Sequence, residues 1–103
     1  MNRRASQKPL TKLARGRECQ IRVPLYCCDD NTTVVPCHVR LAGISGAGYI
    51  SDAIFVAHGC HRCHAVVDGQ QDSEYTFEQR RLMLLEGMVR TQAILLREGK
   101  IHV

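Results

Sequence analysis

No apolar run in the sequence approaches the roughly 20 residues that a helix needs to span a bilayer. The basic stretch at residues 1–8 is not followed by an apolar segment, so we expect no secretory signal and place the protein in the cytoplasm. Internal repeats and low-complexity tracts are absent as well. A membrane partner is therefore not expected, and 45% hydrophobic with 23% charged residues favours a globular chain over disorder or a coiled coil.

The chain is also too short to form a large hydrophobic core. With 103 residues it can form one small domain, which buries only about two-thirds of the surface that the unfolded chain exposes. A second means of stabilisation is expected at this size, and the six cysteines could provide it. In a reducing cytoplasm, closely spaced cysteine and histidine residues favour a metal site over disulfides, so zinc is the first candidate.

The cysteines are spaced like the two halves of a zinc site. Cys60 and Cys63 form a C-x2-C pair, which supplies half of a tetrahedral site. Cys19 and Cys27 are the natural other half, and Cys28 competes with Cys27 for that place. Four protein ligands leave no position for water, so such a zinc would be structural. The alternative is that the cysteines are buried free thiols.

Acidic residues are missing from the start of the chain. Six basic residues precede the first acid, Glu18, and the net charge of the whole chain is +4. A basic arm of this kind suits a polyanion such as nucleic acid, although a solvated tail is the plainer alternative. We therefore divide the chain into a basic flexible arm, residues 1–8, and a folded domain, residues 9–103. The arm residues expected to bind nucleic acid are Arg3, Arg4 and Lys8.

The first two-thirds of the chain predicts a short helix and then strands. The helix is expected over residues 9–15, and a strand over residues 19–23, where apolar and polar residues alternate. Two further strands, over residues 32–39 and 53–57, flank a glycine-rich loop and would form a hairpin with a long connection.

The last third of the chain predicts two helices. Residues 60–68 favour a helix that Gly69 ends. The second helix starts at a capping box formed by Thr76 and Gln79 and continues to Gly99. Together with the strands, these helices predict a small α+β domain with a long C-terminal helix. The apolar residues expected to form the core face of that helix are Phe77, Leu82, Leu85, Met88, Val89, Ala93 and Leu96.

A second group of polar residues could hold a catalytic cation. His64 and Asp68 lie four residues apart on the predicted helix, so they project from one face. Imidazole with carboxylate suits Mg²⁺, Mn²⁺ or a later transition metal. His38, at the end of the preceding strand, could act as a general base beside that cation, with a plain core or surface histidine as the alternative.

These elements resemble a known endonuclease family. A strand with His38, a glycine-rich loop, a second strand and Cys60-His61-Arg62-Cys63-His64 at a helix start resemble the HNH, or ββα-metal, motif. Residues 14–24, 38–43 and 86–92 are similar to the YbcO family of prophage-encoded nucleases and its phage relatives, and the similarity covers nearly the whole chain after about residue 10. It implies a zinc-stabilised ββα-metal (HNH-like) fold and a role in phage DNA processing.

The resemblance also implies roles for single residues. His38 matches the general base and His64 a metal ligand, and Asp68 fits an additional ligand four residues further on. Asp52 stands near the asparagine that pins the loop and orients the base. Cys37 occupies a position where HNH enzymes usually place an acidic or histidine metal ligand. The family match also favours Cys27 over Cys28 as zinc ligand.

We therefore expect a metal-dependent endonuclease that hydrolyses phosphodiester bonds in nucleic acid, with DNA as the favoured substrate. His38 would take a proton from water, and a divalent cation such as Mg²⁺ at His64 and Asp68 would stabilise the developing charge. Arg40 and Arg62 would position phosphate groups, although either could be a plain solvated cation. The alternative is a non-catalytic, zinc-stabilised DNA-binding or adaptor module.

Overall fold

The computed structural model describes residues 12–41 and 54–101. Of the helix predicted over residues 9–15, residues 9–11 lie outside this range, and residues 13–15 belong to a turn. Residues 42–53, in the connection between the predicted strands, lie outside it as well. The predicted site residues that lie outside the described residues are Arg3, Arg4, Lys8 and Asp52.

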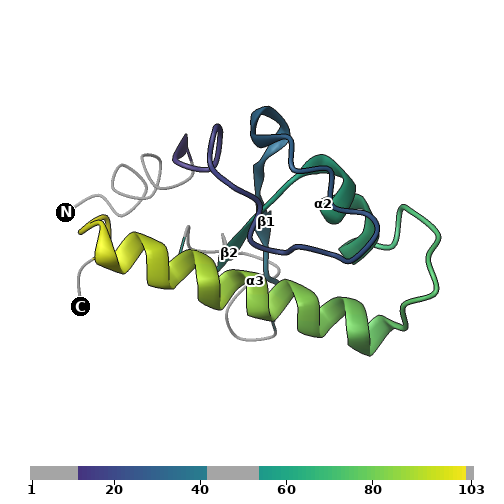
Figure 1. Cartoon of the computed structure of the whole chain (residues 1–103). Coiled ribbons are helices and arrows are strands. Elements are labelled where there is room, and N and C mark those ends of the chain that lie inside the picture. The colour runs from purple at the N-terminus through teal and green to yellow at the C-terminus, as the bar shows by residue number, and fades with distance from the viewer. Residues whose placement is uncertain (1–11, 42–53, 102–103) are drawn as a thin grey trace.

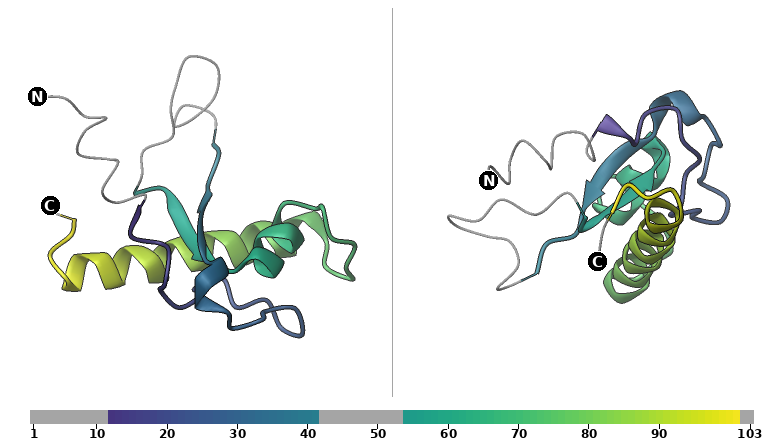
Figure 2. Two further views of the ribbon diagram at one scale, coloured as in Figure 1. Left: turned by 90° about the horizontal axis from the view of Figure 1, so that it is seen from above. Right: turned by 90° about the vertical axis from the view of Figure 1, so that its left-hand side faces the viewer.

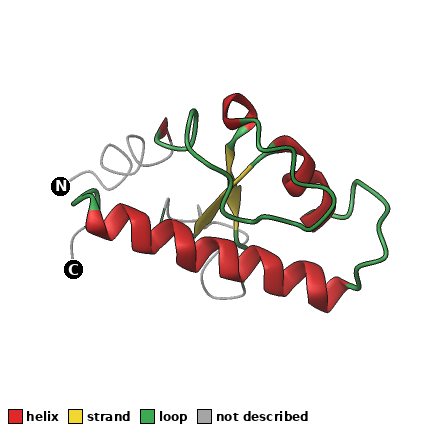
Figure 3. Cartoon of the chain, in the orientation of Figure 1, coloured by secondary structure: helices red, strands yellow, loops and turns green. Residues whose placement is uncertain are grey.

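The described residues form a small α+β fold with one long helix (Figures 1 and 3). The predicted α+β class and long C-terminal helix are thereby confirmed. In the described part of the chain, no helix has both the length and the apolar character needed to cross a membrane. The elements in chain order are η1 (Asn31–Thr33), β1 (Val35–His38), β2 (Val56–Gly59), α2 (His61–Val67) and α3 (Phe77–Arg97).

Strands β1 and β2 form the predicted hairpin. They pair antiparallel, with Val35 opposite Gly59 and His38 opposite Val56. Pro36 lies opposite His58, and because each strand of a two-stranded sheet has a free edge, a residue without an N–H group is tolerated there. Both strands are shorter than predicted. Strand β2 starts three residues later and ends two residues later than the predicted segment 53–57.

The strand predicted over residues 19–23 is wrong. Arg22 has a φ of 58° and Leu25 a φ of 71°, so the backbone turns through left-handed conformations instead of extending. The segment makes one bond to the hairpin, in which the Gln20 N–H donates to the His58 carbonyl at 2.6 Å. The apolar alternation instead reflects burial of Ile21 and Val23 in the core.

Helix α2 starts immediately after β2, as its cap residues predict. Cys60 is the N-cap, with extended backbone angles, and its sulfur accepts a bond from the Cys63 N–H. Gly69, with a φ of +81°, follows the C-cap residue Asp68. Because β2 and α2 adjoin, the side chains of α2 are placed beside the end of the hairpin.

Helix α3 begins at the predicted capping box. The Gln79 N–H donates to the Thr76 side chain, and the Gln79 side chain accepts from the Thr76 N–H. The helix ends at Arg97, and Gly99, just after the C-cap residue Glu98, has a φ of +74°. Both ends of α3 were therefore predicted from local signals.

The core face predicted for α3 is only partly correct. Leu85 and Met88 pack against the core, but Phe77 and Val89 are 65% and 60% exposed. Leu82 and Leu96 are exposed as well. The residues that are buried are Leu84, Gly87, Thr91 and Leu95.

Small residues explain this shift of the buried face, because α3 crosses the hairpin at close range (Figures 1 and 2). A Cβ atom on Gly87 would stand 3.0 Å from Ile21 Cγ1 and 3.2 Å from Ala57 Cβ. One turn on, the Thr91 hydroxyl donates to the Gly87 carbonyl at 2.8 Å and accepts from the His58 N–H at 3.0 Å. Glycine and threonine thus mark the line along which α3 meets β2.

Candidate metal centre and active-site pocket

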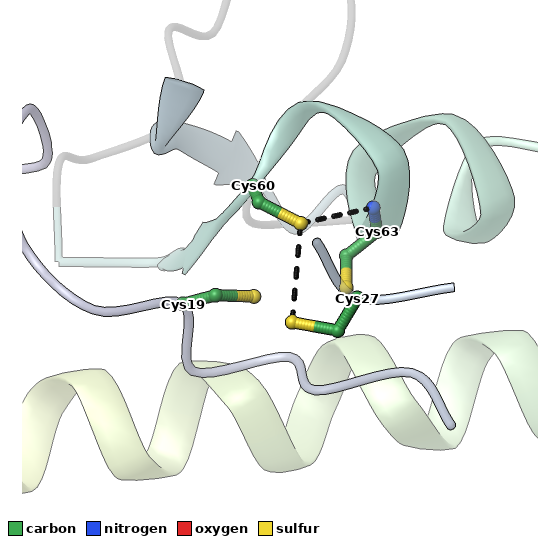
Figure 4. A group of neighbouring side chains, drawn as sticks. All are labelled: Cys19, Cys27, Cys60 and Cys63. Carbon is green, nitrogen blue, oxygen red and sulfur yellow. Dashed lines mark hydrogen bonds between the residues drawn. The ribbon is translucent and has the colours of Figure 1, made fainter. Parts of the chain in front are cut away.

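Four cysteine side chains converge at the start of α2 (Figure 4). The sulfur atoms of Cys19, Cys27, Cys60 and Cys63 all lie within 4.8 Å of one another, and those of Cys27 and Cys60 are 4.0 Å apart. In a tetrahedral zinc site with Zn–S bonds of about 2.3 Å, neighbouring sulfurs lie about 3.8 Å apart. The donor set and its spacing therefore fit zinc, and we call this group the thiol cluster.

Both halves of the thiol cluster follow from local structure. Cys60 ends the turn from β2 into α2, and Cys63 lies one helical turn further on, with its N–H 3.5 Å from the Cys60 sulfur. The Val23 N–H donates to the Cys63 sulfur at 3.4 Å. Cys19 and Cys27 come from the irregular segment, whose left-handed residues turn it back toward α2. The same left-handed turns that prevent a strand there thus bring in two donors.

Three thiols of the cluster, those of Cys19, Cys27 and Cys63, differ in pKa. A hydrogen bond with Cys63 lowers the pKa of Cys19 to about 4, while the pKa of Cys63 is raised by the same bond and by burial. Burial raises the pKa of Cys27 to about 12. Without a cation, these shifts favour a thiolate at Cys19 beside protonated Cys27 and Cys63. A divalent cation would favour release of the remaining protons, because it offsets the repulsion between neighbouring thiolates.

Two further cysteines lie outside the thiol cluster. The Cys28 sulfur is 3.8 Å from His61 Nδ1 and 3.9 Å from the Thr33 hydroxyl. Cys37 is buried, and burial raises the pKa of its thiol to about 12. Because side chains alternate along a strand, Cys37 faces the core while its neighbour His38 faces outward.

His38 lines a pocket of about 160 Å³ that β1, α2 and α3 form together. We call it the His38 pocket. Its apolar wall consists of Val67, Phe77 and Leu84. Its polar and charged lining residues are His38, Arg40, Asp68, Arg80 and Arg81.

The predicted base and one predicted cation ligand, Asp68, line this pocket together, and the other predicted ligand, His64, lies beside Asp68. Asp68 lines the pocket with His38, and the Asp68 carboxylate lies 3.2 Å from His64 Nε2. Burial, followed by the charges of Arg40 and His64, lowers the pKa of His38. A lowered pKa keeps the imidazole neutral near pH 7, which is the form that can accept a proton.

The two arginines predicted to bind phosphate groups lie in different places in the structure. Arg40 lines the His38 pocket, whereas Arg62 is exposed on α2 and does not line it. Sequence reasoning missed Arg80 and Arg81, which belong to the first turns of α3. The sequence carries no signal for this role, because an arginine in the first turns of an amphipathic helix is typical of a solvated face.

Comparison with known proteins places this arrangement in a family. Residues 8–100 match the family described as "Putative nuclease YbcO". The chain is 41% identical over 95 residues to proteins of the same description from Escherichia coli K12 and Enterobacteria phage 82, which covers 89% of this chain and 95% of each relative.

A solved structure has a similar fold. It is described as "Structure of a putative bacteriophage protein from Escherichia coli str. K-12 substr. MG1655" and matches with a TM-score of 0.72 at 34% sequence identity. The match covers 87% of this chain and 99% of the other. The matched residues 8–100 include both the thiol cluster and the His38 pocket. The chain therefore belongs to the family described as "Putative nuclease YbcO", which has members in a bacterium and in a phage.

Proposed function

We propose that the protein is a metal-dependent endonuclease of the HNH type that hydrolyses phosphodiester bonds in DNA, in a phage or prophage setting. The observation that carries the proposal is the meeting of His38, from β1, with Asp68, from α2, in one pocket. Helix α2 follows the hairpin directly, which is the element order of a ββα-metal domain. The nuclease description of the family supports the same chemistry.

The proposed reaction is an attack of water on phosphorus. His38 takes a proton from the water, whose oxygen forms a bond to phosphorus while the bond from phosphorus to the leaving oxygen breaks and that oxygen gains a proton from solvent. His64 and Asp68 would hold a divalent cation, which supplies stabilisation of the charge on the phosphate group. Arg40 would hold a neighbouring phosphate at the rim of the pocket.

The thiol cluster would hold a structural zinc through Cys19, Cys27, Cys60 and Cys63. Its four sulfurs would complete the tetrahedral shell, so this zinc would take no part in the chemistry. Its role is to fix the start of α2, the helix that carries His64 and Asp68. Zinc and cleavage are thereby linked through one helix.

Nucleic acid is also expected to contact residues away from the pocket. We propose that Asp52 orients His38 and that Arg62 and the basic arm bind the phosphate backbone of DNA. Deleting residues 1–8, which removes Arg3, Arg4 and Lys8, should lower the slope of log affinity against log salt, at about 0.9 per lost contact. An unchanged slope would leave the arm as a solubility tail.

One observation favours a second candidate, a non-catalytic, zinc-stabilised DNA-binding or adaptor module. Cys37 stands where HNH enzymes usually carry a metal ligand, and its side chain is buried in the core rather than in the His38 pocket. The cation would then depend on His64 and Asp68. The two candidates differ in whether DNA is cut.

The deciding experiment is a cleavage assay on plasmid and branched DNA with Mg²⁺, Mn²⁺ and Ni²⁺. His38→Ala should lower turnover by roughly 10² to 10⁴, with zinc content and DNA affinity nearly unchanged. The control is His61→Ala, which removes an exposed histidine outside the pocket and should cut like wild type. If wild type cuts nothing with any of these cations, the adaptor module replaces the nuclease. If His38→Ala cuts as fast as wild type, the proposed mechanism with His38 as the base is wrong.

A further inference from the structure

We propose that Arg80 of α3 binds the scissile phosphate group inside the His38 pocket. The inference rests on the proposed nuclease function and adds a substrate-binding residue to it. It arises from three features of the structure: the balance of charge in the pocket, the contacts of the Arg80 guanidinium, and the different role of its neighbour Arg81.

The charge of the pocket favours an anion. Three arginines, Arg40, Arg80 and Arg81, line it together with a single acidic residue, Asp68. The Asp68 carboxylate is itself paired with His64. Positive charge therefore exceeds negative charge in a pocket of about 160 Å³ that also contains the proposed base. The single negative charge of a phosphodiester group would offset part of this excess at the place where water must attack.

Arg80 is held in place without an acidic partner. Its guanidinium carbon lies 5.8 Å from the centre of the Phe77 ring, and a Cβ on Gly69 would stand 2.8 Å from its Nη1. The guanidinium is thus confined between the start of α3 and the end of α2. Among residues 12–41 and 54–101, Arg80 forms no ion pair, so its N–H groups can receive an anion.

Arg81 differs from Arg80 in this respect. Its Nη2 donates to the Arg40 carbonyl oxygen at 2.6 Å, which ties α3 to the residue two positions after His38. This bond uses part of the donor capacity of Arg81 to hold the wall of the pocket. Arg80, which makes no such bond, is the better placed of the two to grip two phosphate oxygens at once, as a planar guanidinium does.

The test compares Arg80→Ala with Arg97→Ala. Both variants remove one arginine from α3, and the two positions lie about 25 Å apart along a helix that rises 1.5 Å per residue. Binding of a fluorescent DNA duplex is measured over a range of salt with no added Mg²⁺ or Mn²⁺ and no chelator, so that the thiol cluster keeps its zinc, and a gel run afterwards checks that the duplex is uncut. Arg80→Ala should lower the salt slope by about 0.9 relative to wild type, and Arg97→Ala should leave it unchanged.

Cleavage with Mn²⁺ under single-turnover conditions is the second measurement. Arg80→Ala should slow it roughly 10²-fold, the usual effect of losing one group that stabilises transition-state charge. Arg80→Lys keeps the charge but cannot form the bidentate hydrogen bonds of a guanidinium, so it should recover only part of the rate. It also provides a second variant if Arg80→Ala melts at a lower temperature than wild type.

The outcomes separate the inference from the nuclease proposal. If wild type cuts DNA and Arg80→Ala matches Arg97→Ala in both slope and rate, the phosphate site at Arg80 is overturned and the nuclease stands. If wild type binds but does not cut, and Arg80→Ala alone lowers the slope, the nuclease is overturned and the phosphate site is supported. A loss in Arg80→Ala of both slope and rate supports the two together.

Discussion

The thiol cluster takes three of its four sulfurs from buried cysteines, whereas the charged groups of the His38 pocket are exposed or half-buried. In the cluster, backbone N–H groups already point at sulfur, and all four sulfurs converge on one point. In the pocket, the groups surround a space instead. The difference indicates that a cation in the cluster would belong to the folded state, while the pocket has to admit and release a substrate.

Helix α2 connects the two regions. Cys63 belongs to the cluster, and the next residue, His64, is paired with Asp68 at the pocket. A change in the cluster should therefore reach the pocket, because the same short helix carries both. A change in the pocket should affect the cluster less, because Cys19 and Cys27 come from another segment of the chain.

The largest expected effect is the loss of the fold in Cys60→Ser. The variant removes a cluster ligand, and the binding free energy of a structural zinc, about 10 kcal/mol or more, is also folding free energy. Elemental analysis should find one zinc per wild-type chain and little in the variant, and circular dichroism should show it unfolded. Cys28→Ser, outside the cluster, is the control and should keep both zinc and fold. Wild type that is folded without metal would rule the zinc site out.

The next largest effect is expected from His64→Ala, which should damage the pocket and spare the cluster. Removing a cation ligand should raise the Mn²⁺ concentration for half-maximal cleavage at least as much as losing an outer-shell partner does, roughly 10- to 100-fold. Added Mn²⁺ should therefore restore part of the activity, but it should not restore His38→Ala. Equal rescue of both variants, or zinc loss in His64→Ala, would contradict the separation of the two regions.

A smaller effect is expected from Thr91→Val, which acts on the helix that supports both regions. The variant leaves the buried His58 N–H without its acceptor, so the free energy of unfolding should fall by about 1–3 kcal/mol. Thr91→Ser keeps the hydroxyl and should lose less. Urea unfolding measures both, and a Thr91→Val protein as stable as wild type would show that this bond adds nothing.

The smallest effect is a shift in the pH profile. His38 acts as a base only when neutral, so kcat/KM should fall as the pH drops through its pKa. Burial and the charges of Arg40 and His64 lower that pKa, so the midpoint of the acidic limb should lie below the ordinary value of about 6.5. Arg40→Ala should move the midpoint upward, because it removes one of these charges. A midpoint above 6.5 in wild type would argue against His38 as the base.

Local signals in the sequence were enough to predict the helices and the hairpin. The capping box at Thr76 and the glycines at 69 and 99 each act within one helical turn, so they are visible without knowing the fold. The irregular segment could not be predicted in this way. Its alternating apolar residues are buried as the pattern requires, but left-handed Arg22 and Leu25 carry no signal, since neither is glycine or asparagine.

The candidate site likewise contains residues that local patterns predicted and residues whose place depends on how the helices and strands pack. The C-x2-C pair and the His64 and Asp68 pair are local patterns on α2, and the structure places each pair together. Arg80 could not be assigned to the pocket, because that depends on how α3 packs against β1 and α2. In isolation an arginine in the first turns of an amphipathic helix is typical of a solvated face.

The amides of Val23 and Cys63 point at sulfur atoms of the thiol cluster rather than at carbonyl oxygens. A thiolate accepts a hydrogen bond more strongly than a thiol, so the exchange of these two hydrogens for deuterium depends on whether the cluster is metal-bound. Amides in the middle of α3 exchange only when a much larger unit opens. Deuterium exchange at Val23 and Cys63 would therefore report local opening of the thiol cluster, whereas exchange in the middle of α3 would report unfolding of the whole domain.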